Sequence, residues 1–170
     1  MAQETRLSNL EDALLKLDTE VIKKEIETDE DLADIDYVRQ KKLREMSEAC
    51  ADAIEFGFDI QLSDGHIHHF SLTIVDQVMI MALAQKAKAG QTVLPWHADG
   101  EACEFFSPED ILRVNSAMED LITYNETYFN SLKQYILSMN VIEQLNAVTY
   151  GQEIPEAYWS DVYRAIITPT

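Results

Sequence analysis

Cysteine is scarce in this sequence, and long apolar runs are missing. Only Cys50 and Cys103 occur among 170 residues, and no Cys-x-x-Cys pair is present. A disulfide framework is therefore not expected, and both thiols are expected to be reduced and buried. No apolar run is long enough to span a membrane, and the first residues lack the charged head and apolar core of a signal peptide. These absences predict a protein that is made in a cytoplasm and has no membrane partner.

Signatures of the common catalytic sites are also missing. The sequence has no Gly-x-Ser-x-Gly elbow and no Gly-x-x-x-x-Gly-Lys or Gly-x-Gly-x-x-Gly phosphate loop. A carboxylate pair could be drawn from Asp64, Asp76, Asp99 and Glu101, but turns explain the first and third of these and helix capping explains Asp76. We therefore expect no enzymatic activity, no catalytic residues and no cofactor.

Histidines and aromatic residues leave a weaker alternative open. His66 and His68 share one face of an expected strand, and His97 and Cys103 approach it if the two hairpins pair. Zinc motifs usually have compact, paired spacings, which this chain lacks, so the prediction is no metal. A metal- or sugar-dependent enzyme remains the third hypothesis, because several aromatic residues could line a carbohydrate or protein groove, although such residues more often pack in the core. These aromatic residues are Trp96, Trp159, Tyr150, Tyr158 and Tyr163.

Positive charge is the other shortage. Thirteen Lys and Arg residues face 31 Asp and Glu residues, which gives a formal net charge of −18. Repulsion from phosphate argues against nucleic acid as a partner. An acidic protein that mimics DNA and occupies a basic groove is not excluded, but a charge that keeps the chain soluble in a crowded assembly is the simpler interpretation.

The sequence from Phe58 to Phe106 predicts a hairpin, a helix and a second hairpin. Asp64-Gly65 and Asp99-Gly100 are each flanked by alternating apolar and polar residues, which is a strong short-range hairpin signal. The expected strands are Phe58 to Leu62, His66 to Leu72, Val93 to His97 and Glu101 to Phe106, with a helix from about Thr73 to Lys88 between the hairpins.

The remainder of the chain is predicted to be helical. A helix from Leu32 to about Phe56 ends at Gly57, and Ser107-Pro108-Glu109-Asp110 is a strong start for a helix that reaches about Met139. The wide apolar stripe of that long helix favours a helix that faces its own core. The alternative is a coiled-coil seam, and in that case Asn125 would fix the register. Two short helices, Val141 to Tyr150 and Pro155 to Ile166, close the chain. The predicted fold class is α+β, with two β-hairpins forming a small antiparallel sheet on long helices, preceded by an N-terminal amphipathic helix.

The first part of the chain predicts a docking helix. Ser8 to Glu11 forms a capping box, and the helix that it opens carries a heptad-spaced apolar seam. The seam consists of Leu7, Leu10, Leu14, Leu17 and Val21. A helix this short is marginal in water on its own, so it needs a partner in its own domain, in another copy or in another protein. We expect residues 1–36 to be a helical docking segment with an acidic linker, and residues 37–170 to be the α+β domain.

A set of ordered motifs resembles a known family. The motifs are Gly57-Phe58-Asp59-Ile60, Asp64-Gly65, Phe70-Ser71-Leu72-Thr73, Asp76-Gln77, His97 to Cys103, Tyr128 to Leu132 and Tyr150 to Pro155. They resemble an uncharacterised domain of tailed bacteriophages and prophages of Gram-positive gut bacteria, which is often encoded among tail, baseplate and fibre genes. The resemblance covers about residues 37–167 and brings no catalytic residues with it.

The resemblance implies a non-enzymatic structural component of a phage tail or baseplate, such as a fibre attachment or adaptor. Its partners would be other tail, baseplate or fibre proteins, with a homo-oligomer as a further option, and it would be located in the virion after synthesis in the host cytoplasm. The alternative is a phage protein outside the virion, either a tail assembly chaperone or an acidic DNA-mimic inhibitor.

Overall fold

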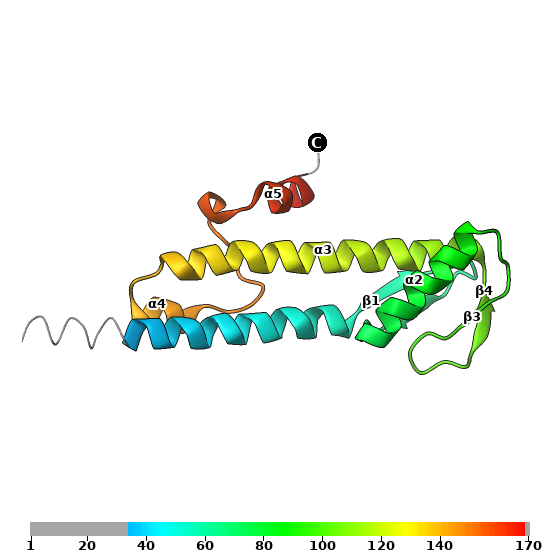
Figure 1. The fold of residues 1–170 in the computed structure, drawn as a ribbon, viewed down its shortest axis with the longest axis horizontal. Coiled ribbons are helices and arrows are strands. Elements are labelled where there is room, and N and C mark those ends of the chain that lie inside the picture. Colours follow the sequence, from blue (N-terminus) through cyan, green and yellow to red (C-terminus); the bar gives the residue numbers. More distant parts are fainter. Residues whose placement is uncertain (1–33, 169–170) are drawn as a thin grey trace, which may run out of the picture.

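Two long helices lie side by side and form the frame of the molecule. The computed structural model describes residues 34–168, of which residues 34–56 are helical and α3 (Pro108–Ser138) runs back along them (Figure 1). The hairpins and α2 lie at one end of this frame, and the short C-terminal elements lie along the other part of α3. The α+β class predicted from the sequence is confirmed.

The two hairpins form two separate two-stranded sheets and not one continuous sheet. β1 (Phe58–Gln61) pairs with β2 (Ile67–Phe70), and β3 (Leu94–Trp96) pairs with β4 (Glu104–Phe106), both antiparallel. Between the hairpins lies α2 (Ile74–Lys88), as the sequence predicts.

The second hairpin is shorter than predicted. The Asp99-Gly100 turn does form, since the Glu101 amide donates to the Ala98 carbonyl over 3.1 Å, but the strands stop short of it. The Asp99 amide instead donates to the His69 carbonyl of β2, and its carboxylate accepts from the amide and hydroxyl of Ser71. Residues 97–103 therefore form a loop that folds against the first hairpin with Ala98 fully buried.

Local capping signals define the helix starts as predicted. The Thr73 hydroxyl and the Asp76 carboxylate form a reciprocal capping box at α2, and the Ser107 hydroxyl accepts from the Asp110 amide at α3, with Pro108 in the first turn. Gly57, at φ 81°, follows residues 34–56 in the left-handed conformation that helix ends favour.

The C-terminal elements are shorter than expected. The predicted helix from Val141 to Tyr150 is α4 (Ile142–Ala147), and the predicted helix from Pro155 to Ile166 is divided into the 3₁₀ turn η1 (Glu156–Tyr158) and α5 (Asp161–Ile167). The division falls where the Ser160 hydroxyl accepts from the Tyr163 amide, so Ser160 caps a new helix.

The core has two parts, both built on α3. Near the hairpins, Ile111, Val114 and Met118 pack with β2, α2 and Cys50, while the other half of α3 packs with Met46, α4 and the C-terminal elements. Asn125 lies inside this core, where its amide donates to the Leu121 carbonyl and its oxygen accepts from the Tyr150 hydroxyl. The stripe of α3 therefore faces its own domain, as predicted, and is not a seam to another chain.

Candidate interaction surface

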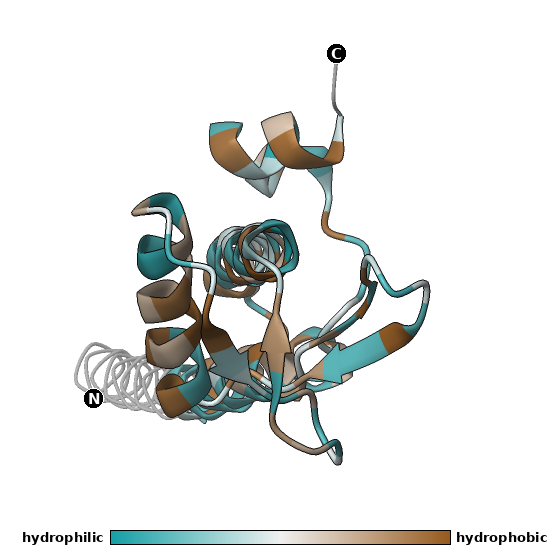
Figure 2. Ribbon diagram, turned by 90° about the vertical axis from the view of Figure 1, so that its right-hand side faces the viewer, coloured by the Kyte–Doolittle hydropathy of each residue, from teal (hydrophilic) through white to brown (hydrophobic). Residues whose placement is uncertain are grey.

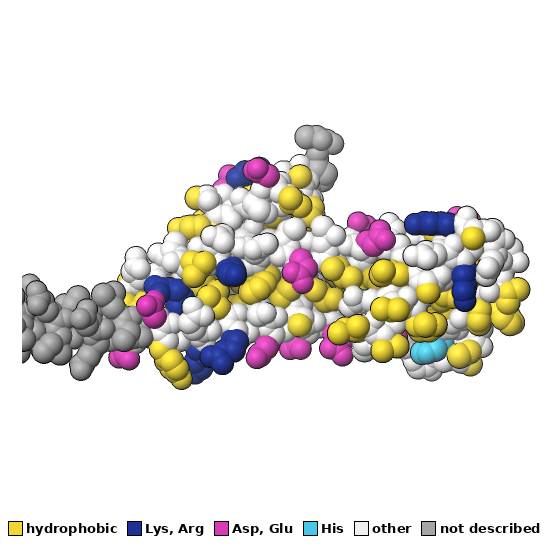
Figure 3. Space-filling view, in the orientation of Figure 1, with side chains coloured by type: hydrophobic (Ala, Val, Ile, Leu, Met, Phe, Trp, Pro, Cys, Tyr) yellow, Lys and Arg dark blue, Asp and Glu magenta, His cyan; other side chains and the backbone are white. Residues whose placement is uncertain are grey.

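One side of α2 exposes apolar side chains to solvent. Ile74 is 79% exposed, Val75 69%, Val78 59% and Met81 48%, and Met79 joins them. We call these five residues the α2 apolar face. In Figure 2, α2 stands at the edge of the molecule with no described element on its outer side, and in Figure 3 hydrophobic side chains spread over this end of the molecule. Clusters of exposed apolar residues on soluble proteins mark contact sites for other molecules.

The opposite side of α2 explains why the helix stays in place. Ile80, Leu83, Ala84 and Ala87 are buried against the core that α2 shares with α3. α2 is apolar around most of its circumference, but the domain covers only one side of it, so the other apolar side remains exposed. Sequence reasoning did not find this surface, although the density of apolar residues from Ile74 to Ala84 was the available signal.

The start of α2 is held rigidly from two directions. The capping box of Thr73 and Asp76 satisfies its first turn, and the Gln77 side-chain amide donates to the Leu72 carbonyl over 2.8 Å. The Leu72 amide in turn donates to the carbonyl of Glu55 in the first helix over 2.9 Å. A face presented on such a fixed helix is preorganised, which lowers the entropy cost of binding a partner.

The charged residues at the C-terminal end of α2, beyond the α2 apolar face, are basic. Lys86 and Lys88 lie exposed in the last turn of α2, and none of the ion pairs among residues 34–168 involves either of them. The one acid of the helix, Asp76, is engaged in the capping box. On a chain with net charge −18, this surface therefore favours an apolar partner that carries acidic side chains.

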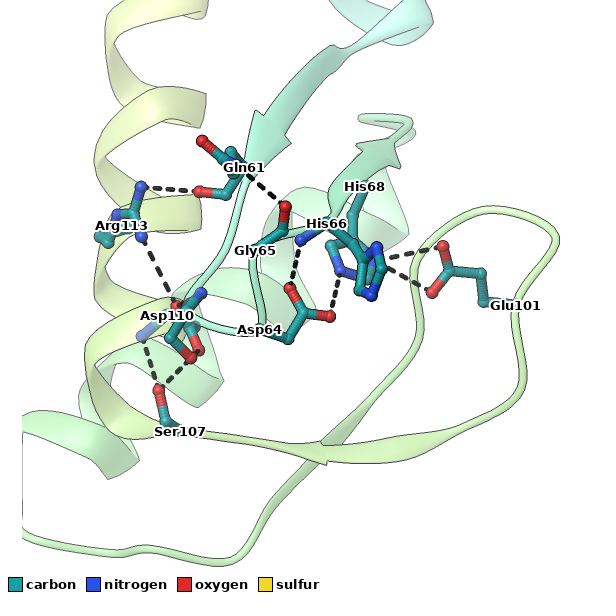
Figure 4. A network of polar contacts seen from close by, with 10 residues as sticks. Gln61, Asp64, Gly65, His66, His68, Glu101, Ser107, Asp110 and Arg113 are labelled. Atoms are coloured by element: carbon teal, nitrogen blue, oxygen red, sulfur yellow. Dashed lines mark hydrogen bonds and ion pairs between the residues drawn. The ribbon is translucent and has the colours of Figure 1, made fainter.

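A histidine between two carboxylates joins the hairpins (Figure 4). The His68 ring is buried, with Nδ1 3.0 Å from Glu101 Oε2 in the second hairpin and Nε2 3.0 Å from Asp64 Oδ2 in the first turn. Burial acts to lower the pKa of His68, but the hydrogen bonds and charges of both carboxylates outweigh it, so the pKa is raised. The backbone amide of His66 is the main cause that lowers the pKa of Asp64.

The buried carboxylate of Asp110 ties the first hairpin to α3. Asp110 accepts from the Ser63 amide at 3.0 Å, from the Ser63 hydroxyl and from the Ser107 hydroxyl at 2.8 Å. Burial acts to raise the pKa of Asp110, but these hydrogen bonds and the Arg113 guanidinium overcome it and lower the pKa. These hydrogen bonds and ion pairs give the polar residues at this end of the molecule a structural role.

The residues considered for a metal are not brought together. His66 and Cys103 are exposed, the His97 ring stacks on Trp96, and both nitrogens of His68 already contact carboxylates. No group of three potential ligands suited to a metal occurs in the described part of the chain. The expectation that Cys103 is buried in a strand is wrong: it lies in the loop before β4, whereas Cys50 is buried as predicted.

The aromatic residues considered for a groove are mostly used in packing. The Tyr150 hydroxyl donates to Asn125, Tyr163 packs against Tyr128, and the Trp159 indole donates to the Ile154 carbonyl over 2.7 Å. Two open hollows of about 550 and 490 Å³ share Tyr158, and no charged side chain lines either of them. They contain no pair of acid and base groups for chemistry.

Four exposed acids of the helix over residues 34–56 form one short stripe. Glu45, Glu48, Asp52 and Glu55 recur every three or four residues and are all exposed, while Lys42 pairs with Glu45 at 2.9 Å. This stripe from Glu45 to Glu55 resembles the row of carboxylates expected of a DNA mimic, but it is confined to one helix.

Two further expectations concern the N-terminal segment and membrane-spanning helices. The predicted docking seam of Leu7, Leu10, Leu14, Leu17 and Val21, and nearly all of the segment 1–36, lie outside the residues that the structure describes. Among residues 34–168, no helix is both long enough and apolar enough to cross a bilayer.

The site and fold together define a small helical frame that carries two hairpins and one partly uncovered apolar helix. The chain belongs to the DUF4376 family, because the family model described as a domain of unknown function matches residues 37–152. This match agrees with the uncharacterised domain family expected from the motifs. The comparisons with curated proteins and with solved structures give no match.

Proposed function

We propose that this chain is a non-enzymatic structural component of a phage tail or baseplate that acts through protein–protein contacts. The α2 apolar face is the observation that carries the proposal, because a fixed helix with one uncovered apolar side is built for contact with another protein. The tail and baseplate assignment rests on the resemblance of the ordered motifs, and it implies a location in the virion after synthesis in the host cytoplasm.

The size of the face suits a specific contact. Each aliphatic side chain that is moved fully out of water contributes about 1.5–3 kcal/mol. Several such residues on one helix are sufficient for a contact near micromolar affinity after the ordering costs of several kcal/mol are subtracted. In a particle, repeated copies and neighbouring contacts strengthen such an interface further.

Purified particles provide the test. Quantitative mass spectrometry of mature virions should find the chain at a fixed copy number, and Val78→Asp should abolish its incorporation because a carboxylate would be buried without a partner. Val162→Asp is the matched control, since Val162 is 55% exposed on α5, away from α2 (Figure 1). Normal incorporation of Val78→Asp, or complete absence of the wild-type chain from virions, would contradict the proposal.

The alternative is a phage protein outside the virion. A tail assembly chaperone would also use the α2 apolar face, but it would bind tail proteins during assembly and be missing from mature particles. The acidic stripe from Glu45 to Glu55 favours a DNA mimic instead, and that activity would weaken steeply with salt and survive Val78→Asp.

A further inference from the structure

We propose that the α2 apolar face binds the leucine seam of residues 7–21 from a second copy of the chain, with the two segments antiparallel. This inference rests on the proposed function, because it names the partner of the same surface. The seam lies outside the described residues, so the argument uses its sequence and the geometry of the surface that would receive it.

The spacing of the two segments matches over their whole length. Along α2, the positions on the exposed side follow steps of four, three, four and three residues: Ile74, Val78, Met81, Gln85 and Lys88. The seam read backwards follows the same steps: Val21, Leu17, Leu14, Leu10 and Leu7. Two helices with the same heptad steps keep their apolar positions opposite one another, so three exposed apolar residues of α2 would each face a residue of the seam.

Charge decides between the two possible directions. In the antiparallel arrangement, Leu10 and Leu7 lie opposite the end of α2. Glu11, Asp12 and Arg6, which together carry a net charge of −1, then lie near Lys86 and Lys88. In the parallel arrangement, Val21 lies opposite Gln85. Lys23 and Lys24 then approach the same lysines together with Glu20 and Glu25, so the net charge near them is zero. The net negative charge beside Lys86 and Lys88 favours the first arrangement, and the second arrangement offers these lysines no net attraction.

The position of residue 34 favours a second copy as the source of the seam. The described chain begins at the end of the frame opposite α2 (Figure 1), and the helix over residues 34–56 is about 34 Å long at 1.5 Å per residue. Residues 22–33 span at most about 43 Å when fully extended. The chain's own seam would thus reach α2 only with its linker nearly straight, whereas a neighbouring copy carries no such constraint.

Disulfide trapping tests both the contact and its source. In a full-length Cys103→Ser background, a chain carrying Leu14→Cys is mixed with a chain carrying Met81→Cys under mild oxidation. The expected product is a linked pair of chains, and the control mixture of Leu14→Cys with Val162→Cys should give none. Absence of the linked pair overturns the proposal. So does a link that forms only within one chain when both cysteines are placed on it, since the seam would then cover its own α2.

Charge reversal tests the direction. The double variant Lys86→Glu with Lys88→Glu should weaken self-association in sedimentation at low salt by about tenfold. Combining it with Glu11→Lys and Asp12→Lys should restore most of the association. A restoring effect of Lys23→Glu with Lys24→Glu in place of those changes would show the parallel arrangement and overturn the proposal.

Particle incorporation separates this inference from the proposed function. If no cross-link forms but Val78→Asp still abolishes incorporation, the surface binds another tail protein and only the present inference fails. If the cross-link forms but the chain is missing from virions, self-association stands and the structural role in the particle fails.

Discussion

The buried ring of His68 in the first hairpin contacts the exposed Glu101 in the loop of the second hairpin, with Nδ1 3.0 Å from Oε2. The Asp64 carboxylate contacts the other ring nitrogen, Nε2, at 3.0 Å, so one histidine joins both hairpins through its two ring nitrogens. The contact requires a protonated ring if both carboxylates are to accept hydrogen bonds from it. The arrangement couples the packing of the hairpins to pH.

The first prediction is a loss of stability as pH rises. The folded-state pKa of His68 is raised above its unfolded value of about 6.5. Its contribution is therefore fully present below about pH 6.5 and is lost as pH rises through the higher, folded-state pKa. Urea unfolding at several pH values should show this decline, and His68→Gln should flatten it. His69 needs its own variant, His69→Gln, because its hydrogen bond to Asp59 also raises its pKa. An unchanged decline in both variants would contradict the assignment.

The second prediction concerns the start of α3. Ser107→Ala removes the hydroxyl that accepts from the Asp110 amide, and a lost cap of this kind costs about 1 kcal/mol. For a chain of this size the melting temperature should fall by about 2–4 °C. Ser107→Asp, which can still cap the helix, should recover part of the loss. A melting temperature unaffected by Ser107→Ala would mean that the helix start does not depend on this residue.

The third prediction compares two glycines with similar backbone angles. Gly57 has φ 81° and a Cβ added there would lie 1.8 Å from the Phe70 carbonyl oxygen, whereas Gly90 has φ 83° and open space around it. Gly90→Ala should cost about 1–2 kcal/mol for the left-handed conformation alone. Gly57→Ala should cost clearly more, since the helix end and β2 must also move apart. Equal losses in thermal melts of the two variants would remove the steric explanation.

The fourth prediction compares the two sides of α2. Val78→Ser should leave the free energy of unfolding within about 0.5 kcal/mol of the wild type, because the side chain is 59% exposed. Ile80→Ser should cost about 3 kcal/mol or more, because Ile80 is fully buried and its replacement leaves a cavity and a hydroxyl in the core. Guanidinium unfolding measures both. A large loss in Val78→Ser would mean that this side is covered within the chain.

The fifth prediction addresses the segment before the described residues. Deleting residues 1–30 should leave the melting temperature of the body unchanged while abolishing incorporation into particles, since the seam is proposed to bind another copy. Circular dichroism with a thermal melt and a co-purification assay provide the two measurements. An earlier melt with normal incorporation would place the seam on its own domain.

Features governed by close neighbours in the sequence could be predicted without the structure. The Thr73–Asp76 capping box, the Ser107 cap and the turn at Asp64-Gly65 each depend on groups within a few residues of one another. Their hydrogen bonds form whatever the rest of the chain does, so composition and spacing were sufficient.

Long-range contacts decided the features that the sequence did not reveal. The second hairpin stops early because Asp99 bonds to His69 and Ser71, residues about 30 positions away, and this places Cys103 in an exposed loop. The His68 contact with Glu101 depends on the same folding of the loop.

α2 shows most clearly how the contributions of sequence and tertiary structure differ. Its sequence determined an apolar helix, but only packing against α3 decided that Ile80 is buried and Val78 faces solvent, because a helix apolar on all sides has no intrinsic inner face.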